Sequence, residues 1–156
     1  MPHTQTFHTS AGVLHIVATA RGVAQVAIGD DTNDEGTDSA ANPATLAQWV
    51  AEIERRLQGL EPSVDVPLDL TGTPFQRRVW AELQQIPRGS RCSYKEVAAR
   101  LGAPTAARAV AGACAANRVA VLIPCHRVVR GNGALGGYRW GVAHKQRLLD
   151  AESQAR

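Results

Sequence analysis

Residues 93–116 read SYKEVAARLGAPTAARAVAGACAA, the stretch that decides how the second half of the chain folds. Ser93 and Glu96 have the spacing of a capping box, in which two side chains satisfy free N–H groups at the start of a helix. Apolar residues follow at helical spacing until Gly102 ends that first helix. A second cap at Thr105 begins another helix, so we expect a helix-turn-helix at about 93–116.

The second helix of this pair has almost none of the long polar side chains that read base edges in the major groove. Alanines and a glycine make up most of it, and Arg108 is its one basic residue. Such a helix can approach a phosphate backbone or a shallow groove closely without reading sequence. The composition is also typical of a helix packed tightly inside a protein, and helical hairpins that do not bind DNA have the same pattern.

The segment before the helix pair predicts a further helix. Thr73 and Gln76 form another capping box, with Pro74 at the first helical position. Arg77 and Arg78 then face water or a partner. One face of this helix, which ends before Pro87, is apolar and consists of Phe75, Val79, Leu83 and Ile86.

The first part of the chain has the pattern of a small α/β unit. Runs rich in β-formers at 13–17 and 23–28 flank Arg21 and Gly22, which together are a hairpin signal.

A helix is expected after the hairpin, with Asn42 as its N-cap and Pro43 in its first turn. Its apolar residues recur at helical spacing: Leu46, Trp49, Val50, Ile53, Leu57 and Leu60. We therefore expect an α/β fold of two domains. Residues 1–70 form an amino-terminal α/β domain of hairpin or sheet plus helix, and 71–156 form a mainly helical domain that contains the helix-turn-helix.

The net charge of +3 conceals a division along the chain. Residues 1–70 hold three Arg against ten acidic residues, a net of −7, whereas the remainder holds fourteen Lys and Arg against four acidic residues, a net of +10. The second half has the charge of a protein with a polyanionic partner, or of one with a solvated basic face. No apolar run approaches a membrane span and the start has no signal-peptide pattern, so we expect a soluble, cytoplasmic protein.

A cysteine and a histidine stand side by side in the sequence IPCHRVV at 123–129. Neighbouring cationic or imidazole groups can lower a thiol's pKa from about 8.5 toward neutrality, which favours the reactive thiolate. The alternative is a buried structural cysteine in a strand. On a strand, Cys125 and His126 point to opposite faces, so they cooperate only if the backbone turns there or a water bridges them. The three cysteines are odd in number and have no Cys-x-x-Cys spacing, so no disulfide framework, metal site or cofactor is expected.

The chain from 71 to about 152 closely resembles the O6-alkylguanine-DNA alkyltransferases, also called methylated-DNA-protein-cysteine methyltransferases, of the bacterial type. The motifs that carry this resemblance occur in the right order and spacing. They are Thr73-Pro74-Phe75-Gln76, Ser93-Tyr94, Arg108-Ala109-Val110, Ala116-Asn117, Ile123-Pro124-Cys125-His126-Arg127-Val128, Gly137-Tyr138-Arg139-Trp140-Gly141, and Lys145 with Leu148-Leu149.

The resemblance implies direct, irreversible transfer of an alkyl group, mainly methyl, from O6-alkylguanine in DNA to Cys125, with O4-alkylthymine as a second substrate. His126 is then the base, acting through a water, and Glu152 orients its imidazole. Tyr94 lies near the damaged nucleotide's phosphate and protonates the departing guanine. The product is a thioether, for which the sequence offers no route back to a thiol, so each molecule reacts once.

The resemblance also implies that 71–156 is a winged helix-turn-helix-like domain that binds DNA and carries the catalytic groups. It implies base flipping out of double-stranded DNA, with Arg108 filling the vacated stack while its helix lies in the minor groove. It assigns the substrate to Asn117, Val128, Tyr138, Arg139, Trp140 and Lys145. It assigns DNA contacts to Tyr94, Lys95, Arg108, Ala109, Gly112 and Gly131. We expect a monomer with little sequence preference and no membrane partner.

Other function classes fit the sequence less well. A non-catalytic protein that binds alkylated DNA lesions would keep the helix pair but replace the nucleophile, and Cys125 argues against it. A helix-turn-helix regulator would need base-reading side chains on its second helix. A cysteine hydrolase would turn over repeatedly, whereas alkyl transfer stops after one equivalent.

Overall fold

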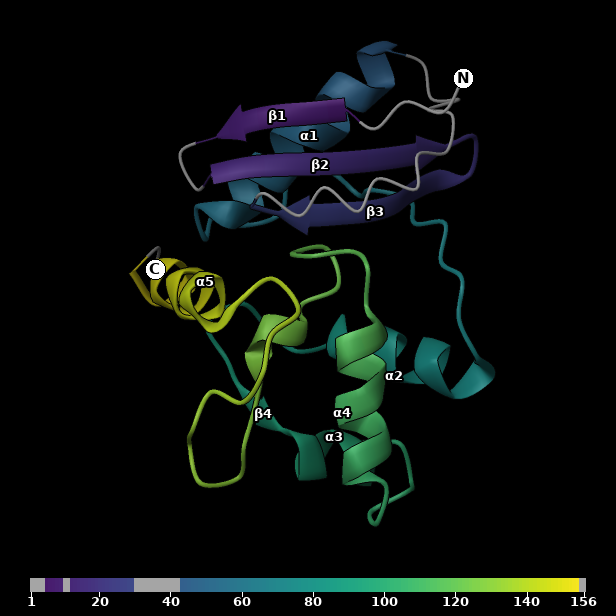
Figure 1. Cartoon of the computed structure of the whole chain (residues 1–156), viewed down its shortest axis with the longest axis vertical. Helices are drawn as coiled ribbons and strands as arrows, with labels where there is room; N and C mark the ends of the chain where they lie inside the picture. The colour runs from purple at the N-terminus through teal and green to yellow at the C-terminus, as the bar shows by residue number, and fades with distance from the viewer. Residues whose placement is uncertain (1–4, 10–11, 30–42, 155–156) are drawn as a thin grey trace.

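The computed structural model describes residues 5–9, 12–29 and 43–154 of the chain. Within these residues, β1 (Gln5–Thr9), β2 (Gly12–Thr19) and β3 (Gly22–Ile28) form an antiparallel sheet in the order β1-β2-β3. The hairpin expected from the sequence is present as β2 and β3, whereas the sequence pattern does not predict the edge strand β1. Helix α1 (Pro43–Leu57) covers one face of the sheet (Figure 1). The expected cap Asn42 lies outside the described residues.

Helix α1 ends in a tight C-terminal cap. The N–H of Gly59 donates to the Arg56 carbonyl, and the N–H of Leu60 donates to the Arg55 carbonyl, the two bonds of a Schellman motif. Gly59 has a φ of +76°, which only glycine adopts at little cost. The expectation that Leu60 belongs to the buried face of the helix is wrong, because the chain has already left the helix and this side chain is 37% exposed.

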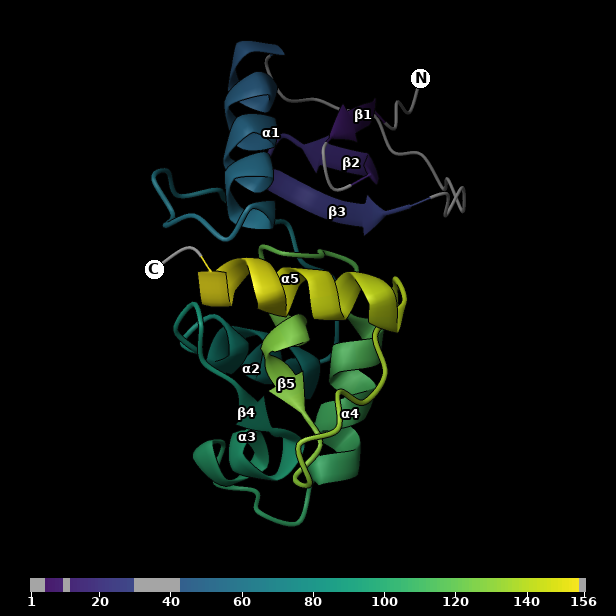
Figure 2. The same ribbon diagram turned by 90° about the vertical axis from the view of Figure 1, so that its left-hand side faces the viewer.

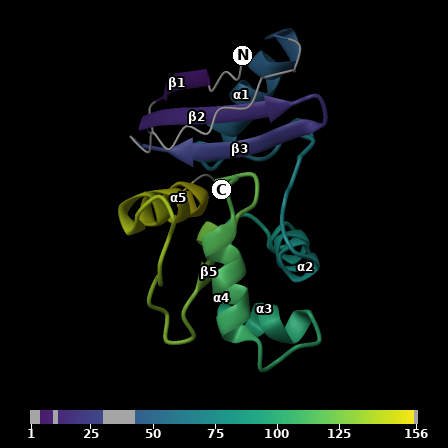
Figure 3. The same ribbon diagram turned by 45° about the vertical axis from the view of Figure 1, so that its right-hand side comes forward.

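The second half is mainly helical and includes α2 (Pro74–Leu83), α3 (Tyr94–Arg100), α4 (Ala107–Ala116) and α5 (Val142–Gln154). Two short strands, β4 (Cys92–Ser93) and β5 (Val128–Val129), pair in parallel and bring distant segments together. A single 3-10 turn, η1 (Cys125–Arg127), precedes β5. Figure 3 shows α3 and α4 as neighbouring helices at the end of the molecule remote from the sheet.

Both capping boxes form as predicted, at Thr73 with Gln76 and at Ser93 with Glu96. The cap predicted at Thr105 is wrong. The N–H of Ala106 donates to the Ala103 carbonyl in a separate turn, so α4 begins after Ala106 with no side-chain cap.

The two halves are joined through the edge of the sheet. On β3, Val26 donates its N–H to the Arg118 carbonyl at 2.9 Å and accepts from the Ala120 N–H at 3.0 Å. Val23 pairs in the same way with the segment 67–69. One hydrophobic core therefore runs through both halves. Figure 2 shows α5 lying across the molecule between the sheet and the helices. None of the helices in the described ranges has the length and apolar character needed to cross a membrane.

Candidate active site

Cys125 lies in the first position of the 3-10 turn η1 and not in a strand. The turn supplies the change of backbone direction that Cys125 and His126 need in order to cooperate. Both side chains are buried. The chain enters the turn through Val121, which has a φ of +72°. This backbone conformation is costly for a β-branched residue, about 1–3 kcal/mol, and such strain is common near functional sites.

Asn117, at the C-terminal end of α4, holds the thiol in place. Its Nδ2 donates to the Cys125 sulfur and to the Ile123 carbonyl, both at 3.2 Å, while its Oδ1 accepts the Val119 N–H at 2.8 Å. The side chain is fully buried. One amide thus links α4 to the turn that carries Cys125.

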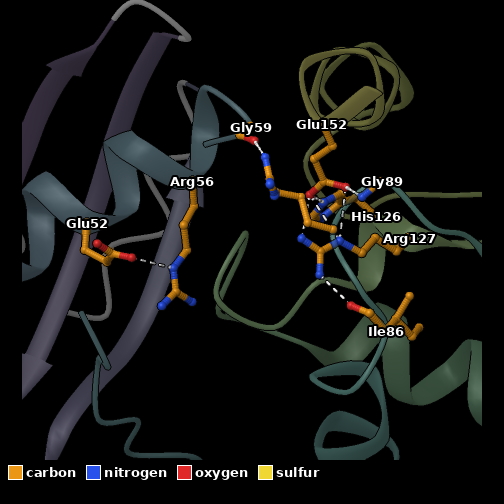
Figure 4. A network of polar contacts seen from close by, with 9 residues as sticks. Glu52, Arg56, Gly59, Ile86, Gly89, His126, Arg127 and Glu152 are labelled. Atoms are coloured by element: carbon orange, nitrogen blue, oxygen red, sulfur yellow. Dashed lines mark hydrogen bonds and ion pairs between the residues drawn. The ribbon is translucent and has the colours of Figure 1, made fainter. Parts of the chain in front are cut away.

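Next to Cys125 in the chain, His126 places its Nε2 2.7 Å from Oε1 of Glu152 on α5. Arg127 donates to both oxygens of that carboxylate and to the Ile86 carbonyl (Figure 4). Burial would raise the pKa of Glu152, but hydrogen bonds from His126 and Arg127 outweigh burial and lower it to about 2. An ionised carboxylate only accepts, so the proton of the imidazole lies on Nε2.

The other imidazole nitrogen is therefore the basic one. Burial lowers the pKa of His126 despite the opposing effect of Glu152, so the ring is neutral at pH 7. Its Nδ1 is buried and has no hydrogen-bond partner within the described part of the chain. A neutral imidazole with a free Nδ1 is able to accept a proton.

The thiol itself differs from the sequence expectation. Burial raises the pKa of Cys125 to about 11, although the Asn117 hydrogen bond and the charge of Lys145 act in the opposite direction. The predicted fall of this pKa toward neutrality is therefore wrong for the free protein, because desolvation exceeds the effect of the neighbouring groups. The thiol is protonated at pH 7 and needs a base when it reacts.

A cavity of about 330 Å³ lies between the helix pair and the loop before α5. This volume is at the lower end of small-molecule sites, roughly 300–1,000 Å³. Its lining consists of Tyr94, Ala111, Cys114, Ala115, Cys125, Gly137, Tyr138 and Arg139. The buried hydroxyl of Tyr138 has no partner among the described residues. A larger cavity of about 600 Å³ lies between the sheet and the helices, but no cysteine lines it.

Four of the expected substrate residues, Asn117, Val128, Trp140 and Lys145, do not line the cavity that contains the thiol. Trp140 packs its ring edge-to-face on Tyr138, with centroids 5.1 Å apart, and Val128 is fully buried in β5. Lys145 is also fully buried, and its Nζ donates to the carbonyls of Val128, Leu135 and Gly137. Trp140 therefore supports the lining residue Tyr138, and Lys145 fixes the backbone of the lining residue Gly137.

The expected DNA contacts lie on or beside the helix pair. Lys95, Arg108, Ala109, Gly112 and Gly131 are exposed, and Tyr94 is half-buried at the cavity. Within the described residues, the guanidinium of Arg108 has no hydrogen-bond or ion-pair partner. By contrast, Arg77 and Arg78 donate to the carbonyls of Leu70 and Leu101. No group of three or more His, Cys, Asp or Glu within the described ranges could hold a metal ion.

Among the ionisable residues of the site, two are not predicted by the sequence. Arg127 lies within the IPCHRVV motif, but nothing in its position indicates that it binds Glu152 from the far end of the chain. Cys114 lines the cavity with Cys125, and burial raises its pKa to about 12. The sequence indicates a role for Cys114 only through its position on an apolar helix, and a core residue would occupy the same kind of position.

Comparison with known proteins gives the family of this site. A sequence profile described as "6-O-methylguanine DNA methyltransferase, DNA binding domain" matches residues 74–154. The methylated-DNA--protein-cysteine methyltransferase of Mycobacterium bovis is 36% identical over 153 residues, which cover 97% of this chain and 93% of that protein. The chain belongs to the 6-O-methylguanine DNA methyltransferase family.

Other members of this methyltransferase family differ in length. The bifunctional transcriptional activator/DNA repair enzyme Ada of Escherichia coli K12 is 41% identical over 148 residues, which cover 89% of this chain but 42% of that protein. The regulatory protein ada of Salmonella typhimurium is 50% identical over 111 residues and is covered to 31%. The chain thus spans less than half the length of both. The crystal structure of Mycobacterium tuberculosis OGT in complex with DNA superposes with a TM-score of 0.85 at 35% identity, covering 96% of this chain and 92% of that one.

Proposed function

We propose that this chain repairs DNA by moving an alkyl group, mainly methyl, from O6 of guanine to the sulfur of Cys125 in a single, irreversible turnover. The observation that carries the proposal is a buried thiol that lines a cavity of about 330 Å³ and shares its 3-10 turn with the neutral His126, which is bonded to Glu152. The same chemistry on O4-alkylthymine is part of the proposal.

In the proposed step, the thiol proton passes to Nδ1 of His126, directly or through a water, while Asn117 donates to the developing thiolate. The sulfur attacks the alkyl carbon, so an S–C bond forms as the C–O6 bond breaks. The Tyr94 hydroxyl, whose pKa is raised by burial, donates a proton to the departing guanine. The proton taken up by His126 balances that loss. Glu152 is ionised and stabilises the imidazolium as it forms.

The proposed partner is double-stranded DNA, bound in the minor groove by α4 with little sequence preference. Arg108 would fill the stack left by a flipped nucleotide, since its side chain is exposed and free to do so among the residues that the structure describes. The DNA complex of the related Mycobacterium tuberculosis protein supports this class of partner. We further propose that the protein acts as a monomer in the cytoplasm.

Intact-protein mass spectrometry after mixing with a duplex that contains O6-methylguanine tests the proposal. One methyl mass should be added and should map to Cys125, whereas Cys125→Ala should bind the duplex and gain nothing. A protein that binds the lesion without reacting would leave the wild-type mass unchanged. A methyl group on Cys92 or Cys114 would contradict the proposed nucleophile.

A further inference from the structure

The cap that ends α1 packs directly against the helix that carries Glu152. A Cβ atom added at Gly59 would overlap the Ala151 carbonyl oxygen and would lie 2.7 Å from the backbone nitrogen of Glu152. Both are backbone atoms of α5, which cannot rotate aside as a side chain would. The amino-terminal unit therefore contacts the backbone of Glu152 itself, at a distance that only glycine permits.

A second connection runs through Arg88, in the loop between α2 and β4. Its Nη1 donates to the Gly59 carbonyl, and the next residue, Gly89, points its N–H at Oε2 of Glu152 at 3.4 Å. Two residues before Arg88, the Ile86 carbonyl accepts a hydrogen bond from Arg127, which also binds the Glu152 carboxylate. Figure 4 shows Gly59 on the side of the amino-terminal unit that faces Gly89 and Glu152.

These contacts constrain the carboxylate from both of its sides. The α1 cap limits where the backbone of Glu152 can lie, and the loop at 86–89 meets Oε2, while Oε1 remains directed at Nε2 of His126. Orientation of a base by its hydrogen-bonded partner is a sensitive part of catalysis, and misplacement by a fraction of an ångström lowers the rate.

We infer that the end of α1 positions the catalytic base, and that Gly59 and Arg88 are positioning residues for alkyl transfer, acting through Glu152 on His126. This inference rests on the proposed function. It gives the amino-terminal unit a defined part in a reaction whose groups all belong to the other half of the chain.

The test compares Arg88→Ala, Arg88→Lys and Gly59→Ala with wild type in single-turnover methyl transfer from duplex O6-methylguanine at saturating DNA. A positioned base contributes roughly 10²- to 10⁴-fold, and partial misalignment should remove about three- to tenfold of it. We expect that loss for Arg88→Ala and Gly59→Ala, with unchanged affinity for DNA. Arg88→Lys should restore most of the rate, because an ammonium group also donates to the Gly59 carbonyl.

An NMR titration of His126 measures its pKa, which would not change if Gly59 and Arg88 had a merely structural role. The charged groups that face this imidazole are Glu152, Arg127 and Lys145, and of these Glu152 raises its pKa. Loosening Glu152 should therefore lower the pKa of His126 further in Arg88→Ala and Gly59→Ala.

Two substitutions control for the loss of an arginine and for an alanine at a glycine with positive φ. Arg91→Ala removes an exposed arginine close by in the same connecting segment. Gly29→Ala introduces an alanine at another positive φ, +94°, where the added Cβ meets only a side-chain atom, at 3.7 Å. Both should react at the wild-type rate with an unchanged His126 titration.

The inference is overturned if the Arg88→Ala protein that remains active reacts at the wild-type rate and its His126 titrates normally. If Arg88→Ala reduces only the fraction of protein that is active, the variant has a folding defect, and the inference is overturned as well. If wild type transfers no methyl group, the proposed function fails instead, and the His126 titrations still decide whether Gly59 and Arg88 position Glu152.

Discussion

Glu152 is the carboxylate on which distant parts of the chain meet. It is 3% exposed, and it binds His126 and Arg127 from the η1 turn together with the N–H of Gly89. Because a buried charge is stable only when it is paired, these bonds also contribute to folding. The site and the stability of the fold therefore depend on the same group.

Glu152→Gln should make this contribution visible as a pH effect. The pKa of Glu152 in the folded chain, about 2, lies below its ordinary value of 4.5. The stability it supplies is thus complete above pH 4.5 and is lost as the pH falls from 4.5 toward 2. Near pH 7 the variant should be less stable by about 3 kcal/mol. Urea unfolding at a series of pH values measures the difference, which should shrink below pH 4.5.

The exposed Glu61 supplies the control for this titration. Glu61→Gln should differ little from wild type at any pH, because surface substitutions usually change stability by less than about 0.5 kcal/mol. A stability difference for Glu152→Gln that stays constant from pH 7 to pH 2 would contradict the ionised state assigned to the carboxylate.

Helix α4 shows how one element can serve packing and binding together. Its buried face holds Val110, Ala113 and Cys114, while Arg108, Ala109 and Gly112 are exposed. Small exposed residues permit close approach to a partner, and the one long side chain among them has no partner within the described residues. The second interpretation of this helix, tight packing inside the protein, therefore describes only its other face.

Arg108→Ala should slow repair of O6-methylguanine in duplex DNA much more than reaction with the free alkylated base. Flipping costs a few kcal/mol and is required only in the duplex. Single-turnover rates with both substrates measure the effect, with Arg21→Ala, in the exposed β2–β3 turn, as a control for the loss of one positive charge. Equal losses on both substrates would indicate that Arg108 supports the fold or the thiol instead.

The loop at 130–141 controls the size of the cavity through a stack of side chains. Tyr138 and Arg139 line the cavity, and Trp140, which is 8% exposed, packs on Tyr138 from behind. Trp140 can therefore restrict bulky alkyl groups only by holding Tyr138 in position.

Free O6-benzylguanine should accordingly inactivate the wild-type protein poorly. Overpacking of a formed cavity costs about 1–3 kcal/mol, roughly tenfold or more in rate. Trp140→Gly, with or without Arg139→Ser, should raise the benzyl reactivity while leaving methyl repair largely intact. Inactivation rates with both substrates measure it, and Trp140→Phe serves as a milder variant because loss of a buried Trp destabilises by about 3–5 kcal/mol. Fast benzylation of wild type would contradict the argument.

The whole molecule should unfold as one unit despite its two halves. Backbone hydrogen bonds of Val26 and Val23 join the sheet to segments of the second half, and the buried core is continuous. Trp49 reports on the amino-terminal unit, and Trp80 and Trp140 on the helical half. Single-tryptophan variants followed by fluorescence in urea should have midpoints that coincide once each variant's own stability is taken into account. Separate transitions for the two halves would show that the shared edge contributes little.

Short-range interactions are sufficient to predict the local parts of this protein. Capping boxes, helical apolar spacing and the hairpin pattern depend on neighbouring residues, so α2, α3, β2 and β3 are predictable from short-range interactions. The motifs around Cys125 are local as well, and they indicate the family and most of the proposed site residues without any knowledge of long-range contacts. Thr105 fails as a cap because the turn closed by the Ala106 N–H and the Ala103 carbonyl delays the helix by one residue, so Ala106 occupies the N-cap position.

How the thiol is held, and which residues support it, depends on long-range packing. The contact between Gly59 and Ala151, and that of Arg127 with Glu152, join residues far apart in the sequence, and no local pattern encodes them. The high pKa of Cys125 likewise follows from burial, which depends on how the entire chain packs around the turn. Local sequence determines which groups are available, whereas desolvation and long-range contacts determine their charge and orientation.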